Sequence, residues 1–497
     1  MNGLMIKSIH NRSTKPIKDG DYKRSLKDRH VQLIALGGII GSGYFLGTGE
    51  VINQVGPSAC LGYIFGGLIV FLVMLCMGEL SVAIPISGSF VTYTADLISP
   101  RIACGVGWSY WISWVVYIPA ECIAGGIIME YFTGINGYVW AVLFGLIITY
   151  INITKVSMFG EFEFWLSLIK IIALMIFVAI AILIFFGFIH GDQPSEIIGR
   201  KFIFDQGGLF PNGIPVMLTT MVLLLVNYQG SEIVGLAAGE SVNPSKMIPH
   251  AIRNVTLRIL FIYIVPVFCL VLIFPWYKAN LDHIVFADAL NYYGLPWAGT
   301  IASFVTLTAA ISCANSGLYG IVRALNALAR EGMAPSKLAL LNHNGVPQNA
   351  VIVTLVAIWL VIVLAYFFGQ SAIYVSLLLV SGFTGLMAWI SICWAQINFR
   401  KRLYKAGYTT GDLKFKTPLS PYIGIIAIAL MTACLIFLLL NDNHAYKIAF
   451  VIGITSFVVP VTIHMFHTKR INHKEEYDAN RSLRFKDIFP KRQKKLI

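Results

Sequence analysis

The chain has 497 residues, of which 57% are hydrophobic and 12% charged, and its formal net charge is +13. In an ordinary soluble domain about a quarter of the residues are charged, so the composition excludes a soluble enzyme or binding domain. Apolar stretches long enough to cross a hydrocarbon core recur along most of the sequence. We therefore expect an all-α polytopic membrane protein with about twelve transmembrane helices.

The expected spans run from residue 31 to residue 467. They are residues 31–52, 57–80, 103–132, 136–154, 162–189, 214–238, 250–275, 298–326, 349–368, 371–397, 420–440 and 446–467. Residues 1–30 and 469–497 are polar and basic, and we interpret them as tails outside the membrane.

Lysine and arginine concentrate in both tails and in the loop 400–416. An even number of spans puts all three on one side, and basic residues next to spans mark the cytoplasmic side. We expect a multi-pass protein of the cell membrane with cytoplasmic N- and C-termini. The positive charge then reflects topology and contact with the lipid bilayer, so we expect no nucleic-acid partner. The sequence leaves the oligomeric state open.

The sequence offers no signal for a cofactor. The first thirty residues do not resemble a cleavable signal peptide. The eight cysteines are scattered singly, without the spacing of a metal site or a disulfide framework. No phosphate-binding P-loop is present, so we expect neither a metal nor a cofactor, and an ion gradient rather than ATP as the source of energy.

Two short glycine-centred segments interrupt the apolar spans, one at Gly37–Gly47 and the other at Tyr228–Gly235. Glycine unwinds a helix, and unwound backbone at membrane depth is tolerated only where it lines a cavity or is buried in protein. Two such breaks at matching positions of two halves indicate the substrate site of an inverted-repeat secondary transporter.

Three charged residues lie inside expected spans: Glu121, Lys170 and Glu232. A charge within the membrane is costly, so each is a candidate functional residue. Each also has a structural alternative. Glu121 could be a protonated packing residue, Lys170 could extend to a headgroup, and Glu232 could cap unwound backbone. Glu79 and Glu130, near span ends, fit a structural, interfacial role better.

The breaks themselves suggest the kind of ligand. Where a helix restarts, free N–H groups attract an anion, and Gly41, Ser42 and Gly43 can present such groups closely. The second break exposes carbonyl oxygens that suit a cation. Facing each other, the two breaks form a receptor for a zwitterion, of which a free α-amino acid is the commonest small example.

An ordered series of motifs resembles the amino acid permeases of the amino acid–polyamine–organocation (APC) superfamily, lysine-type permeases above all. It runs over almost the whole chain, through Ala35–Gly43, Met77–Leu80, Pro85–Phe90, Gly230–Gly235, Ala238–Pro244, Ile248-Pro249, Asn315–Gly317 and Arg323. The resemblance implies a LeuT-like fold with discontinuous helices 1 and 6. Two inverted five-helix repeats would occupy residues 31–189 and 190–400, and two further helices residues 401–468.

The resemblance also implies roles for individual residues. Gly41, Ser42 and Gly43 match the break that binds the substrate carboxylate. The stretch around Tyr228, Gln229 and Gly230 matches the part that accepts the amino group and gates the side-chain pocket. Two charged residues match groups implicated in proton coupling: Glu232, and Lys170, whose ammonium would take the place of a sodium ion.

The identity of the amino acid stays open between two classes. Gln229 to Glu232 resembles the motif of permeases for basic amino acids, and Glu121 could pair with a cationic side chain. Asn227, Tyr228 and Tyr44 depart from the lysine-permease pattern and are expected to line the pocket. A cationic amino acid such as lysine or arginine is favoured, with a neutral amino acid as the alternative.

The function favoured by these observations is proton-coupled symport of an amino acid. An amino acid exchanger on the same scaffold is the first alternative, and a transport-deficient sensor or a membrane-embedded enzyme the second. No arrangement of nucleophile and base is visible in the sequence, so we do not expect an enzyme.

Overall fold

The computed structural model describes residues 39–86, 88–154, 159–189, 203, 206–237, 249, 252, 259–281, 283–342, 345–470 and 488–489. Gly37, Gly38 and the sequence-predicted tails, apart from residues 469–470 and 488–489, lie outside this part, as does most of the Ala238–Pro249 motif region. Within it the secondary structure is helical, without a strand. The all-α class expected from the sequence is confirmed.

Fourteen described helices have eight or more residues. They are α4 (Gly47–Val55), α5 (Ala59–Ala83), α6 (Ser89–Leu97), α7 (Pro100–Thr133), α8 (Gly137–Thr154), α9 (Phe159–Phe185), α11 (Gly213–Leu225), α14 (Val265–Ile273), α15 (Val285–Tyr292), α16 (Pro296–Arg330), α17 (Gln348–Ala365), α18 (Gln370–Lys405), α19 (Tyr422–Phe437) and α20 (His444–Arg470). Shorter pieces near the centre are α3 (Ser42–Phe45), η3 (Val226–Tyr228), α12 (Ile233–Ala237) and the π-helix η5 (Ile259–Ile264).

Eight helical segments in the described ranges are long and apolar enough to cross a membrane. One of them, Ser42–Ala83, has 42 residues and covers parts of two expected spans, 31–52 and 57–80. Shorter apolar helices at Gly137–Ile153, Gly213–Tyr228 and Phe261–Ile273 overlap three more. The multi-pass architecture follows. The count of twelve and the inverted repeat stay predictions.

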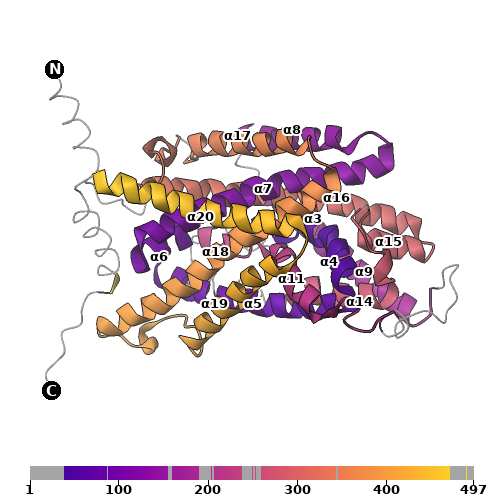
Figure 1. Cartoon of the computed structure of the whole chain (residues 1–497), viewed down its shortest axis with the longest axis horizontal. Helices are drawn as coiled ribbons and strands as arrows, with labels where there is room; N and C mark the ends of the chain where they lie inside the picture. Colours follow the sequence, from indigo (N-terminus) through magenta and orange to yellow (C-terminus); the bar gives the residue numbers. More distant parts are fainter. Residues whose placement is uncertain are drawn as a thin grey trace.

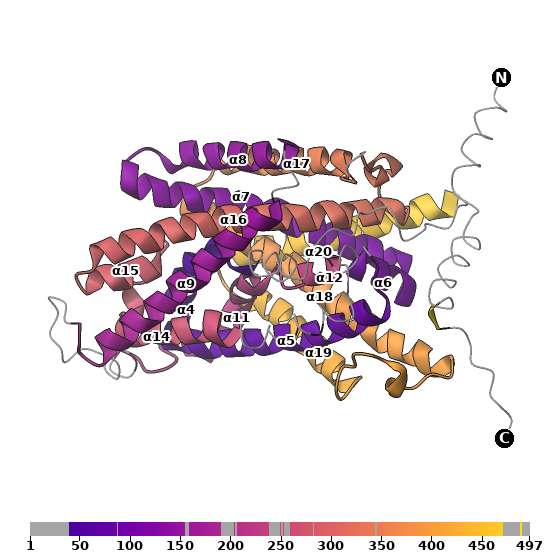
Figure 2. The same cartoon turned by 180° about the vertical axis from the view of Figure 1, so that it is seen from behind.

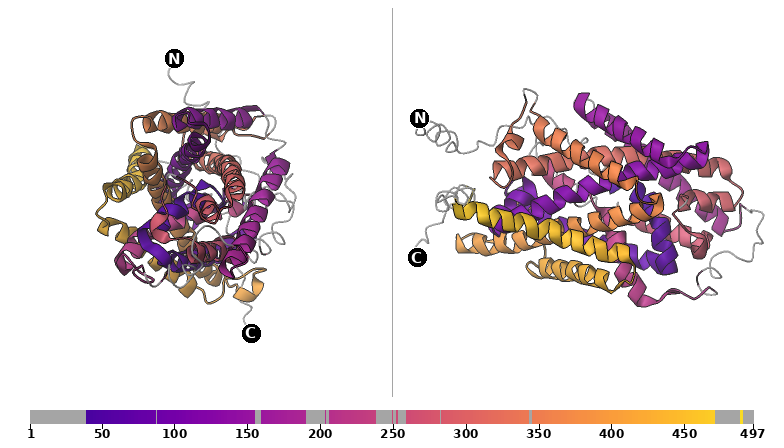
Figure 3. Two further views of the ribbon diagram at one scale, coloured as in Figure 1. Left: turned by 90° about the vertical axis from the view of Figure 1, so that its right-hand side faces the viewer. Right: turned by 45° about the horizontal axis from the view of Figure 1, so that its top comes forward.

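The helices run roughly along one long axis, with α8 and α17 side by side on one flank and α5 and α19 on the opposite flank (Figures 1 and 2). Between them lie α7 and α18, whose apolar windows are 83% buried, whereas those of α9 and α20 are only 28% and 22% buried. A helix that is apolar all round and exposed on one side faces lipid. The end-on view shows the central helices enclosed by the others (Figure 3).

The ends of α7 show how local sequence sets these elements. Pro100 occupies the first turn, where its missing N–H costs nothing, and the Ser99 hydroxyl accepts a hydrogen bond from the Ile102 amide. The helix ends at Gly134, which adopts a left-handed conformation with φ of 67° that glycine tolerates best. This long central helix carries Tyr110, Tyr117 and Glu121.

Both glycine-centred segments interrupt helices, as predicted. At the first break Ile40 and Gly41 are non-helical, Gly41 is extended, and the chain restarts as the short α3. At the second, α11 tightens into the 3₁₀ turn η3, Gln229 is extended and Gly230 has a φ of 103°. We call residues 39–47 the first break and residues 226–233 the second break.

Candidate functional site

The residues predicted to form the site are all described and all buried. The most exposed of the polar side chains among them, that of Gln229, has 4% of its surface accessible. They are Gly41, Ser42, Gly43, Tyr44, Glu121, Lys170, Asn227, Tyr228, Gln229, Gly230 and Glu232. The conformation is therefore closed around this cluster.

The Ser42 amide at the first break donates to the carboxylate of Glu121 on α7. The nitrogen lies 2.9 Å from Oε2 and 3.2 Å from Oε1. The Ser42 hydroxyl is 3.2 Å from that of Tyr374 on α18. The Ser42 amide therefore already has a carboxylate acceptor, which is a side chain of the protein itself.

Lys170 brings a positive charge to the same segment. Its Nζ lies 3.0 Å from the Ile40 carbonyl oxygen and 2.7 Å from the Ser312 hydroxyl on α16. The side chain is fully buried, so the ammonium lies inside the bundle and does not reach a headgroup. It joins α9 and α16 to the unwound backbone.

Glu232 closes the second break on itself. Its carboxylate accepts the Gly230 amide at 3.1 and 3.2 Å, the Tyr110 hydroxyl at 2.8 Å and the Trp389 indole N–H at 3.0 Å. Such a carboxylate caps unwound backbone, which was the structural alternative for Glu232, and it also ties the break to α7 and α18.

The Gln229 side chain lies against α7 and α18. Its Nε2 donates to the Ser113 hydroxyl on α7, and its Oε1 accepts from the Ser381 hydroxyl on α18 at 3.0 Å. Both ends of the carboxamide are thus engaged. In this conformation Gln229 positions the second break, and its side chain has no hydrogen bond to the first.

A cluster of four tyrosines fills the space between the breaks. The rings of Tyr44, Tyr63, Tyr228 and Tyr263 have centroid separations of 4.5 to 6.4 Å. The Tyr263 hydroxyl, from the π-helix η5, lies 3.0 Å from the Ile39 carbonyl and 3.0 Å from the Asn227 carbonyl. It thereby connects the backbone of the two breaks.

Within the described ranges, Asn227 has a hydrogen-bond partner at only one end of its carboxamide. Its Nδ2 donates to the Tyr63 hydroxyl at 2.7 Å, and that hydroxyl is 2.6 Å from Thr48 Oγ1. Its Oδ1 is buried and has no hydrogen-bond partner among the residues that the structure describes. This oxygen would lie 2.9 Å from a Cβ added at Gly43, and the Tyr117 hydroxyl 2.8 Å from it. Two polar atoms therefore converge on the bare backbone of Gly43.

Sequence reasoning did not find Tyr117, Tyr263, Ser312 or Tyr374. Tyr117 carries a usable signal, because it stands four residues before Glu121 and so shares its helix face. Tyr263 precedes Pro266 by three residues in an apolar span, but only the fold shows that it reaches both breaks. Ser312 and Tyr374 are ordinary polar residues of long spans.

Glu79 and Glu130 have structural partners. Glu79 is fully buried and forms an ion pair with Arg400 on α18, and the Thr417 amide donates to it at 2.5 Å. Glu130 accepts the Gly137 amide at 2.9 Å and the Gln370 side chain at 3.1 Å. Their expected structural role is consistent with these contacts, although Glu79 is buried rather than interfacial.

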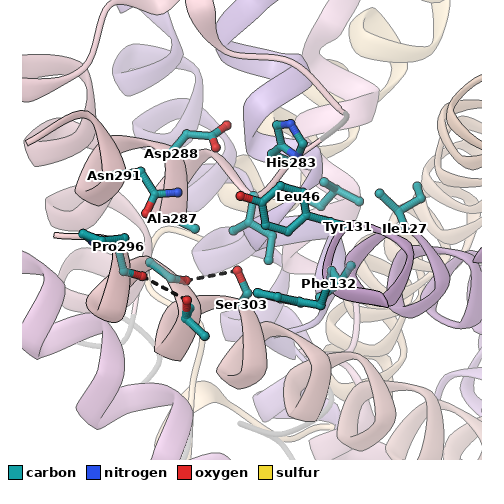
Figure 4. Close-up of a pocket in the computed structure, with 14 residues that line it drawn as sticks. Leu46, Ile127, Tyr131, Phe132, His283, Ala287, Asp288, Asn291, Pro296 and Ser303 are labelled. Atoms are coloured by element: carbon teal, nitrogen blue, oxygen red, sulfur yellow. Dashed lines mark hydrogen bonds between the residues drawn. The ribbon is translucent and has the colours of Figure 1, made fainter. Parts of the chain in front are cut away.

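A cavity of about 490 Å³ meets the first break at Leu46. Its wall includes Tyr131 from α7, His283 and Asp288 near and on α15, and Ser303 on α16 (Figure 4). The Ser303 hydroxyl bonds to its own helix at Gly299 O, 3.0 Å away. The cavity lies toward the end of the molecule marked by α15, away from the basic end of α18 (Figure 1).

The sequence model of the family described as "Amino acid permease" matches residues 30–476, which is most of the chain. The chain belongs to the amino acid permease family. This permease is 39% identical over 464 residues to the amino-acid permease RocC of Bacillus subtilis (strain 168), covering 91% of this chain and 97% of that protein.

Two further relatives cover similar lengths of the permease. The putative histidine permease of the same organism is 37% identical over 468 residues, 93% of this chain and 98% of that protein. The lysine-specific permease LysP of Escherichia coli (strain K12) is 35% identical over 447 residues, 87% and 89% of the two chains. The family expected from the motifs is confirmed.

Proposed function

We propose that this permease is a proton-coupled symporter that imports a cationic amino acid, such as lysine or arginine, across the cell membrane. The observation that carries the proposal is the meeting of opposite charges at the first break. A buried carboxylate lies on the Ser42 amide and a buried ammonium on the Ile40 carbonyl. Buried charges that line unwound intramembrane backbone are a hallmark of transport sites.

In this proposal the substrate carboxylate binds at the Ser42 amide. The substrate amino group binds the carbonyl oxygens of Ile39 and Asn227, which converge from the two breaks on one point, the Tyr263 hydroxyl. An N–H donor beside a pair of carbonyl acceptors matches the two ends of an α-amino acid.

Proton coupling would depend on Lys170. An ammonium held by a carbonyl and a hydroxyl can occupy the place of a bound sodium ion, and it can also release its proton when the site changes its access to water. Glu232 is the second candidate. Its four hydrogen bonds tie it to α7, α18 and the second break, so a change in its protonation would alter contacts between those elements.

A cationic substrate is supported by Glu121, because a buried carboxylate beside the site favours a positive side chain over a neutral one. Two relatives bear the names of a lysine-specific and a histidine permease, and these names differ in substrate. The alternative is a neutral amino acid. In that case Glu121 would bind only the backbone of the first break and protons, and would not pair with the substrate side chain.

We infer cytoplasmic termini from the basic residues at the end of α18 and from Arg470, which ends α20 at the same end of the molecule (Figures 1 and 2). Basic residues mark the cytoplasmic side. The cavity at Leu46 would then face the outside and give access to the first break. An inverted repeat of helices 1–5 and 6–10 accounts for two breaks in one chain.

The test begins with the purified protein in detergent and the twenty amino acids, because a ligand that binds the folded state raises the unfolding temperature. Selective stabilisation by lysine or arginine supports the cationic preference, and stabilisation by a neutral set supports the alternative. Uptake of the best ligand into proteoliposomes follows, with and without an inward proton gradient. Gradient-driven accumulation supports symport, whereas uptake that needs amino acid inside supports exchange.

A further inference from the structure

The polar backbone atoms of the first break are already contacted by side chains of the protein. We propose, building on the transport function above, that Glu121 and Tyr263 are built-in substitutes for the two ends of the substrate. The Glu121 carboxylate occupies the subsite of the substrate carboxylate, and the Tyr263 hydroxyl that of its ammonium. Binding of an amino acid is then an exchange of protein groups for ligand groups.

The evidence for Glu121 is the chemistry and position of its contact. The acceptor on the Ser42 amide is a carboxylate, the same functional group that the substrate would present, and both of its oxygens lie within 3.2 Å of the nitrogen. Two carboxylates cannot share one N–H at full strength, and their negative charges repel at this separation. The substrate carboxylate must therefore displace Glu121.

The evidence for Tyr263 is a mismatch in donors. A tyrosine hydroxyl has a single proton, yet two carbonyl oxygens, those of Ile39 and Asn227, lie 3.0 Å from it. The hydroxyl can satisfy only one of them at a time. An ammonium carries three N–H donors and can bind both carbonyls at once, so it matches this point better than the hydroxyl that holds it.

A third atom shows that the self-occupied site is incomplete. Within the described part of the chain Asn227 Oδ1 has no partner, although the side chain is only 1% exposed, and an unsatisfied buried acceptor is costly. It is directed at Gly43, where the missing side chain leaves the backbone bare. Neither Glu121 nor Tyr263 supplies a donor to it, whereas a bound amino acid brings additional N–H groups.

The exchange explains how an empty binding site can stay closed. Without ligand, the protein groups keep the Ser42 amide and one of the two carbonyls at a time hydrogen-bonded, which meets most of what buried backbone requires. With ligand, the same atoms are satisfied again and Glu121 is released. The released carboxylate is then free to pair with a cationic side chain, so displacement and charge preference would be two successive uses of one residue.

The test separates the contribution of the substrate carboxylate to binding from that of the substrate side chain. Dissociation constants are determined for L-lysine and L-lysinamide, and for L-alanine and L-alaninamide, in the wild type, Glu121→Gln and Glu121→Ala. Within each pair the side chain is the same. Its contribution therefore cancels in the ratio of the dissociation constant of the amide to that of the free acid. We expect this ratio to rise about tenfold or more in Glu121→Ala, the size of one charge-assisted hydrogen bond, and by less in Glu121→Gln.

A ratio that is unchanged or lower in both variants would overturn the role of Glu121. Thermal unfolding without ligand identifies a variant that fails to fold, and Glu121→Gln, which keeps the shape of the side chain, then carries the test. Failure of the transport function looks different, because the wild type itself would then bind none of the twenty amino acids.

Tyr263→Phe tests the other end. Removal of the hydroxyl frees both carbonyls, so we expect discrimination between an amino acid and the acid lacking its amino group to increase several-fold. Tyr293→Phe is the matched control, since it also removes a buried hydroxyl bonded to a carbonyl, that of Ile273 at 2.7 Å, but its ring is on the loop after α15. Equal effects of the two substitutions on discrimination would overturn the role of Tyr263.

Discussion

The first and second breaks interrupt their helices in similar ways but are held by different kinds of contact. At the first break the backbone atoms bond to side chains from distant elements: Glu121 on α7, Lys170 on α9 and Tyr263 on η5. At the second break Tyr263 also reaches the Asn227 carbonyl, but the Gly230 amide bonds to Glu232, two residues away in the same segment. Contacts supplied by other helices can be exchanged for a ligand, whereas a local cap keeps its segment in one shape.

The two breaks would therefore have different roles in substrate binding. The first break would supply most of the receptor, because its contacts resemble those of a substrate, and the second break would add the Asn227 carbonyl. The rest of the second break would keep a fixed position, because Gln229 and Glu232 bind it to α7 and α18. The following substitutions test this difference.

Lys170→Ala should have the largest effect and abolish uphill uptake, because it removes the charge that holds the Ile40 carbonyl and Ser312. The measurement is accumulation of radiolabelled lysine in proteoliposomes under an inward proton gradient. Lys278→Ala is the control, since that lysine is exposed at the surface over Tyr292. Undiminished accumulation in Lys170→Ala would remove the residue from proton coupling.

Glu232→Gln should lower stability by about 3 kcal/mol, because an amide turns an N–H₂ toward donors that a carboxylate accepts. Those donors are Tyr110, Trp389 and the Gly230 amide. Thermal unfolding should therefore change strongly, and the affinity of the folded fraction little. A large loss of affinity at unchanged stability would mean that Glu232 takes part in substrate binding as well as holding the second break in shape.

Gly41→Ala should cost about 1–2 kcal/mol of stability and weaken substrate binding. A Cβ at this position would lie 2.2 Å from Glu121 Oε1 and 2.8 Å from Cys313 Sγ, so the carboxylate has to move. Gly369→Ala is the matched control, because a Cβ there meets nothing within 4 Å. Thermal unfolding and ligand titration of the two variants should differ; equal behaviour would contradict the close packing of Glu121 on the first break.

Tyr374→Phe should have the smallest effect, about 1 kcal/mol or less. The substitution removes one hydroxyl, 3.2 Å from Ser42 Oγ, and leaves the Ser42 amide and its carboxylate in place. We expect affinity for the amino acid to fall by no more than several-fold in a ligand titration. A complete loss of binding would show that side-chain hydroxyls, rather than backbone amides, dominate the first break.

Much of the fold follows from the sequence, because hydropathy and glycine content act locally. The expected spans 103–132 and 298–326 correspond to α7 and α16, which begin at Pro100 and Pro296 and extend a little further. The high cost of charge in lipid singled out Glu121, Lys170 and Glu232, and the structure gathers them around the two breaks. A charged residue inside an apolar span is rare, so it can be recognised from the sequence alone.

The direction of individual side chains could not be predicted. Gln229 stands in an unwound stretch, where no helical period says which way it faces, and it points to Ser113 and Ser381. Tyr263 reaches the breaks through a π-helical turn, a local irregularity without a reliable sequence signal. Contacts between residues more than a hundred positions apart depend on the packing of whole helices.

The buried pair of Glu79 and Arg400 has a mechanical consequence. It joins the end of α5 to α18, and the Thr417 amide and carbonyl bind the same two side chains. Separating these charges inside the protein would leave each without its counterion, at a cost of several kcal/mol. We therefore expect the ends of α5 and α18 to move as one rigid unit, together with the segment around Thr417 that leads to α19. The flexible points of the transport cycle should then lie elsewhere in the protein.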